Sequence, residues 1–289
     1  AATYGIYQVP VRFSAGYKVG GSPQRGVIFR GRVQQAPAQE KAGTVTLMCY
    51  GYDRDIQQQR PESTAVQGSS TSALIQHVVD AIAYPSASVA PGYTVVPWYY
   101  LDGDDCLAEM REIAECEGAL VWVDPQDVTL KFWPWSHWVG ALPVATIDRG
   151  AGTEDVQLTY DYASVFDEAT INYQPRRKGR LATVHSLTTP VLIPANSAVT
   201  QRFRFRYPLA QFVSYTANAR SAGGENLNSN LVVGTTTPVA ATYWLTTLRN
   251  TNTRLGMVVD KFDVVGYPIE GLTNREYRYN AASLRVPRR

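Results

Sequence analysis

One segment, residues 104–138, constrains the fold of this chain more than any other, because it reads as a helix that leads directly into a β-hairpin. Asp104 or Asp105 can cap the helix by accepting a backbone N–H, and Gly118 stands where a C-terminal cap belongs. Strand-favouring runs lie on both sides of residues 124–127, whose Asp-Pro-Gln-Asp sequence favours a turn. Helical spacing predicts an apolar face that is buried against the hairpin. The residues expected to be buried are Leu107, Met110, Ile113 and Ala114, opposite Val121 and Val123.

The rest of the chain divides around this unit. A second apolar stripe predicts a helix over residues 72–84, capped by Ser72 and ended by Pro85. The flanking regions show the alternating, Val-, Thr- and Tyr-rich pattern of strands. We therefore expect a mainly β (α+β) chain with a small helix–hairpin domain. Its expected parts are a first β domain at 1–58, completed by about 145–180, an α/β insert at 59–144, and a second β domain at 181–289.

Composition narrows the function classes. A formal net charge of +2 predicts no strong attraction to nucleic acid or to an anionic membrane. No apolar run is long enough to span a bilayer, so we expect no stable membrane insertion. Three scattered cysteines do not resemble a secreted disulfide framework. The sequence begins Ala-Ala-Thr-Tyr-Gly without Met, so we expect a processed chain or a fragment.

No motif points to catalysis. The three histidines show no metal-ligand spacing, and neither a phosphate-binding loop nor a serine-hydrolase elbow is present. Asp102, Asp104 and Asp105 lack the spaced oxygen ligands of a calcium loop. They are better explained as negative charge at a helix N-terminus. We therefore expect no catalytic residue, no cofactor, no metal site and no enzymatic activity.

Aromatic side chains concentrate on both sides of the helix. Such a set can form a platform that stacks sugars or bases, or it can lie in the core or in a subunit interface. The sequence leaves these alternatives open. The candidate residues are Trp133, Trp135, Trp138, Tyr99 and Tyr100.

Two groups of arginines are candidates for contacts with another subunit. The first lies in the run QPRRKGR, and the second alternates with Phe203 and Phe205. The alternation predicts that the phenylalanines face a β core while the arginines face solvent or another chain. Phosphate contact is the other reading of such clusters. The candidate residues are Arg176, Arg177, Arg202, Arg204 and Arg206.

The helix–hairpin segment resembles one in bacteriophage tail hub proteins, the baseplate or tail-tip hub family. Three further stretches resemble that family in the same order along the chain. They are GVIFRGRVQQAPAQEKAGTVTLMCYGYDRDI, DVQLTYDYASVFDEATINYQPR and MVVDKFDVVGYPI. Together the four stretches contain 101 of the 289 residues, spread between residues 26 and 269, and their order carries the resemblance more than any single motif.

The resemblance implies two tail-tube-like β domains, barrels or sandwiches, and a homotrimeric ring around a DNA channel. Such a ring adapts a hexameric tail tube to a three-fold tip and has no catalytic role. The implied partners are a distal tail protein, the tail tube protein, a tape-measure protein and a tip fibre or spike. Duplex DNA would be present only in transit. The implied location is the virion tail tip, with the host cytoplasm during assembly.

Two alternatives come from other function classes. The tryptophan cluster fits a receptor- or glycan-binding module of a tail tip. A cell-wall hydrolase is the third reading, since four glutamates lie along the second helix. Their spacing suits a solvated helix face better than a pair of facing catalytic carboxylates.

Overall fold

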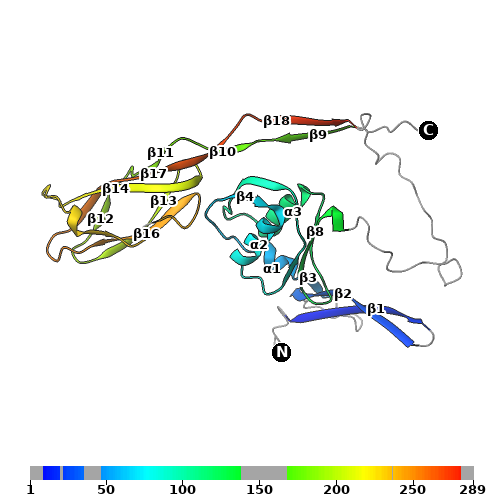
Figure 1. Cartoon of the computed structure of the whole chain (residues 1–289). Coiled ribbons are helices and arrows are strands. Elements are labelled where there is room, and N and C mark those ends of the chain that lie inside the picture. The colour runs from blue at the N-terminus through cyan, green and yellow to red at the C-terminus, as the bar shows by residue number, and fades with distance from the viewer. Residues whose placement is uncertain (1–8, 20–21, 36–46, 138–167, 236, 281–289) are drawn as a thin grey trace, which may run out of the picture.

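The computed structural model describes residues 9–19, 22–35, 47–137, 168–235 and 237–280. The described chain is mostly β, with 49% strand and 15% helix, so the prediction of a mainly β protein is confirmed. Figure 1 shows three parts: a β-ribbon near the N-terminus, a lobe that contains the helices, and a second lobe built from strands. We call the last two the helical lobe and the sandwich lobe.

The helical lobe contains three helices and five short strands. Its helices are α1 (Asp53–Gln57), α2 (Thr71–Ala81) and α3 (Cys106–Glu115). Its strands are β4 (Val66–Ser70), β5 (Ala87–Val89), β6 (Val95–Tyr99), β7 (Leu120–Val123) and β8 (Leu130–Trp133). Strand β4 pairs with β6, while β5, β8 and β7 form a separate sheet.

The core of the helical lobe confirms the predicted helix–hairpin packing. Asp105 caps α3 by accepting hydrogen bonds from the N–H groups of Leu107 and Ala108, and Gly118 has a positive φ of 60° just beyond its end. Met110 is fully buried, and the valines of the hairpin pack against the same core. The buried stripe comprises Leu107, Met110, Ile113 and Ala114.

The ends of α2 differ from the prediction. Ser70, rather than Ser72, is the N-cap: its backbone is extended, and its hydroxyl accepts a hydrogen bond from the N–H of Ala73. The helix ends at Ala81, before Pro85, because Ala83 takes a left-handed conformation with φ of 49°. Ser70 and Ser72 lie two residues apart and have the same side chain, so only backbone geometry shows which of them is the N-cap.

The sandwich lobe has two sheets around one core. Strand β17 (Met257–Gly271) is the centre of the first sheet. The second sheet has the order β13 (Ala198–Arg204), β16 (Tyr243–Asn250), β15 (Leu231–Val233). Phe203, Trp244 and Phe262 come from both sheets and are buried between them. The flanking strands are β10 (Arg176–Lys178), β11 (Ala182–Ser186) and β12 (Val191–Ile193) on one edge of β17, and β14 (Leu209–Arg220) on the other.

Two ribbons extend from these lobes. Near the N-terminus, β1 (Pro10–Val19), β2 (Ser22–Gln35) and β3 (Met48–Gly51) form an antiparallel sheet. Beyond the sandwich lobe, β9 (Glu168–Tyr173) pairs with β18 (Arg275–Asn280). Of the segment expected to complete the first β domain, residues 145–167 lie outside the described residues. Short helical turns at Trp135–His137 and Asn228–Asn230 complete the described structure.

No helix in the described ranges combines the length and apolar character that a membrane crossing requires.

Candidate functional site

A cleft of about 720 Å³ lies between α3, β6 and the segment that leads into β10. It therefore lies where the helical lobe meets the first strand of the sandwich lobe. Carboxylates and aromatic rings dominate its lining. The aromatic residues are Trp98, Tyr99 and Tyr100, and the carboxylates are Asp102, Asp104, Glu109 and Glu112. Arg176 also lines the cleft.

The local sequence explains how these groups converge. Glu109 and Glu112 are three residues apart and therefore share one side of α3. Strand β6 brings Trp98 and Tyr99 beside that side, because it pairs with β4 in the sheet next to α2. Asp104 immediately precedes the cap of α3, so its negative charge lies at the helix N-terminus.

The carboxylates of the cleft favour binding of a positively charged group. Tyr99 donates a hydrogen bond to Glu109, with 3.1 Å between the two oxygens. Burial raises the pKa of Tyr99, and the charge of Glu109 raises it further. Burial likewise raises the pKa of Glu109, and the charges of Glu112 and Asp104 add to that effect, while the Tyr99 hydrogen bond and Arg176 oppose it.

Arg176 supplies the cation that this chain places in the cleft. Its guanidinium lies 5.5 Å from the ring centroid of Tyr100. The cleft thus offers four carboxylates and two tyrosines around one positive charge. In the described ranges, no group of three His, Cys, Asp or Glu side chains has the geometry to hold a metal ion.

The structure separates the aromatic residues that the sequence grouped together. Trp133 packs edge-on against Trp122, with 4.8 Å between ring centroids, and stacks on His137 at 4.2 Å. Trp135 is 58% exposed beside them. Tyr99 and Tyr100 instead line the cleft. Trp138 lies outside the described residues.

The candidate arginines also lie in different surroundings. Arg177 pairs with Glu270 at 3.2 Å, on the neighbouring strand β17. Arg202 pairs with Glu62 at 2.6 Å and lies 3.7 Å from the ring centroid of Tyr243. Arg204 and Arg206 are exposed. The prediction that Phe203 faces the β core is confirmed, since it is 1% exposed, and Phe205 packs against the same core.

The N-terminal ribbon carries a positive charge that was not among the features predicted from the sequence. Residues 10–35 contain five lysines and arginines and no carboxylate. Arg12 and Arg30 stand directly opposite each other in the β1–β2 register, so they share one face of the sheet. The signal was readable as local charge patterning, but the near-zero net charge of the whole chain conceals it.

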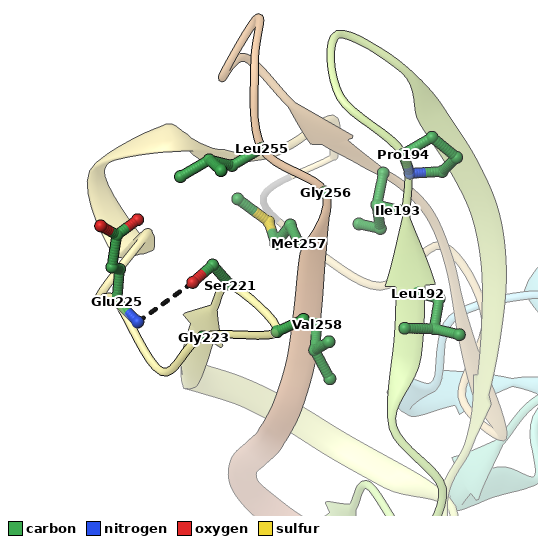
Figure 2. A pocket seen from close by; sticks show the side chains of 11 residues that line it. Leu192, Ile193, Pro194, Ser221, Gly223, Glu225, Leu255, Gly256, Met257 and Val258 are labelled. Carbon is green, nitrogen blue, oxygen red and sulfur yellow. Dashed lines mark hydrogen bonds between the residues drawn. The ribbon is translucent and has the colours of Figure 1, made fainter.

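A second pocket, of about 530 Å³, opens at the far end of the sandwich lobe. Figure 2 shows Leu192, Leu255 and Met257 around it, with Ser221 accepting a hydrogen bond from the N–H of Glu225 at 3.1 Å. Its lining is mainly apolar and lacks a cluster of ionisable side chains. The pocket therefore has few groups that could form ion pairs or hydrogen bonds with a ligand.

No protein-family model matches the chain, and no curated protein is detectably similar to it.

Proposed function

We propose that this protein is a structural hub subunit of a phage tail tip, which assembles as a homotrimeric ring around the DNA channel. The ring adapts a hexameric tail tube to a three-fold tip and performs no catalysis. The N-terminal ribbon and the sandwich lobe supply its two tube-like β domains. The partners are the tail tube, distal tail and tape-measure proteins and a tip fibre or spike, and the location is the virion tail tip.

The observation that carries this proposal is the N-terminal ribbon, which lacks a core of its own. Among the described side chains of β1, β2 and β3, only that of Val33 is buried. Large apolar side chains are instead open to solvent: Phe13 is 50% exposed and Ile28 is 64% exposed. A sheet of this size needs an apolar face covered to be stable, so it fits a subunit that is completed by its neighbours.

Free strand edges support the same proposal. Strand β14 pairs with β17, and between Gln211 and Asn218 its other edge meets no described strand. An exposed edge of this length is a template for pairing with another chain. A closed ring of subunits satisfies such edges without open-ended aggregation.

Mass measurement and imaging test the proposal together. Light scattering across a concentration series should approach three chain masses, and micrographs should show a three-fold ring with an open channel. A chain that remains monomeric at every concentration, with tail tube and distal tail proteins added, would overturn the proposal.

A receptor- or glycan-binding module of a tail tip is the second candidate. It is favoured by the exposure of Trp135 beside the Trp133–His137 stack, since one open aromatic face next to others is a common sugar-binding arrangement. Glycan-array binding that disappears in Trp135→Ala would support it. Array binding that is absent in the unaltered chain would remove it.

A further inference from the structure

The N-terminal ribbon and the cleft have opposite charges. On the ribbon, Arg12 and Arg25 are exposed, and neither forms an ion pair with a carboxylate in the described part of the chain. In the cleft, Asp104 and Glu112 are likewise exposed and form no ion pair with a described cation. Each surface therefore presents the charges that the other lacks.

The cleft also offers aromatic rings to a guanidinium. On the ribbon, the rings of Phe13 and Phe29 lie 5.7 Å apart on the face opposite to Arg12 and Arg30, because consecutive residues of a strand point to opposite faces. Aromatic rings and the side of α3 wall the cleft. Arg176 already sits over Tyr100, which shows that the cleft accommodates a guanidinium against an aromatic face.

The ribbon of a chain does not fill the cleft of the same chain. Strand β2 meets the helical lobe at the side of α3 that carries Leu107 and Arg111. The cleft uses the opposite side, which carries Glu109 and Glu112. Figure 1 shows the same separation, with β1 and β2 below the helical lobe and β10 above it.

We propose that the β1–β2 ribbon of one copy docks on the acidic, aromatic cleft of the next copy. This inference rests on the proposed ring and specifies its contact. Two different surfaces meet at each junction, so the contact is head-to-tail, and three such contacts close a ring. The docked anions also relieve the repulsion between Arg12 and Arg30, which face each other across the strands.

Duplex DNA is the rival partner for a basic ribbon, because phosphate contacts need only clustered cations. The chemistry of the cleft favours docking there instead. Its exposed carboxylates Asp104 and Glu112 form no ion pair with a described cation, and its aromatic rings can pack against a guanidinium.

Charge reversal in the full chain tests the contact. Arg12→Glu combined with Arg25→Glu should raise the dissociation constant of the assembly about tenfold or more, and Glu112→Arg with Asp104→Arg should do the same. Combining all four substitutions in one chain should restore assembly, because every junction of the ring then joins an acidic ribbon to a basic cleft. Arg254→Glu, an exposed arginine outside both surfaces, is the matched control and should leave the constant unchanged. Circular dichroism establishes that each variant is folded.

The outcomes separate this inference from the proposed function. If the chain assembles but neither charge-reversal variant weakens the assembly, the docking contact is wrong while the ring stands. If the unaltered chain never assembles, both are wrong. If Arg12→Glu with Arg25→Glu abolishes binding of a short duplex and leaves assembly unchanged, the ribbon contacts nucleic acid, and the docking contact is again wrong.

Discussion

Arg202 on β13 lies 2.6 Å from Glu62, which precedes β4, so an ion pair joins the sandwich lobe to the helical lobe. Thr242 donates a hydrogen bond to Asp102 at 2.8 Å, and the N–H of Ala241 donates to the carbonyl of Ser63. Each lobe has its own apolar core. The contacts named here are polar, which predicts that salt and charge affect the arrangement of the lobes more than the stability of either lobe.

Arg202→Glu should change the arrangement of the lobes while lowering thermal stability only slightly. The pair is partly exposed, and exposed pairs contribute about 0.2–1 kcal/mol. Small-angle X-ray scattering of the monomer at low salt should show a broader distance distribution for this variant. Arg204→Glu is the control, because Arg204 is exposed two residues further along the same strand. Identical scattering from the two variants would contradict the prediction.

Glu117, which follows α3, forms hydrogen bonds with the start of α2 and with the segment that leads into β6. It is 9% exposed, and one of its carboxylate oxygens accepts hydrogen bonds from the Thr71 hydroxyl and from the N–H groups of Tyr93 and Thr94. Burial by itself raises the pKa of Glu117, but these hydrogen bonds outweigh burial and lower it. We expect Glu117→Gln to cost about 1–3 kcal/mol at neutral pH, because a charged acceptor is lost.

The pH dependence of this contribution has a defined sign. A carboxyl group whose pKa is lower in the folded chain stabilises the fold above the pKa that it has in the unfolded chain. That contribution to stability is lost as the pH falls through the pKa that the group has in the folded chain. Denaturation measured from neutral to acidic pH should therefore show a loss that Glu117→Gln lacks. The exposed Glu115→Gln, two residues earlier, should retain it.

Met110→Ala should destabilise the helical lobe by about 2–5 kcal/mol, because Met110 is fully buried in its core. Chemical denaturation measures the change. Glu115→Ala on the exposed side of α3 is the control and should change stability by less than about 0.5 kcal/mol. Equal effects of the two substitutions would contradict the packing described here.

The sequence predicted the features that local interactions determine. The cap at Asp105 depends on residues within one helical turn. The hairpin turn likewise depends on nearby groups, since Asp124 and Asp127 accept hydrogen bonds from N–H groups two residues ahead. These motifs need no tertiary context, so pattern and chemistry suffice to find them.

The cleft could not be predicted from the sequence, because it depends on contacts between segments that are distant along the chain. Tyr100 meets Arg176 only because β10 begins beside the helical lobe. Tyr99 and Trp133 lie in different sheets, which sequence proximity does not reveal. The core position of Phe203 was predictable, since alternation within one strand fixes which face is buried.

Asn250 should be the most sensitive polar residue of the sandwich lobe. It is fully buried, and its amide nitrogen donates to the carbonyls of Ile193, Pro194 and Leu255 at 3.3, 3.1 and 2.9 Å. Ile193 ends β12, Pro194 follows it, and Leu255 precedes β17, so one side chain holds the rim of the pocket in Figure 2.

Asn250→Ala leaves these carbonyls without their donor and should cost about 1–3 kcal/mol. Asn250→Asp keeps the shape, but an ionised carboxylate faces the carbonyl oxygens and cannot donate to them. Its destabilisation should therefore grow as the pH rises and the introduced carboxyl group ionises. Urea denaturation at several pH values measures both effects, with Asn218→Ala, at an exposed position of β14, as the control. A pH-independent stability difference between Asn250→Asp and the unaltered chain would show that this amide does not act as the donor for the three carbonyls.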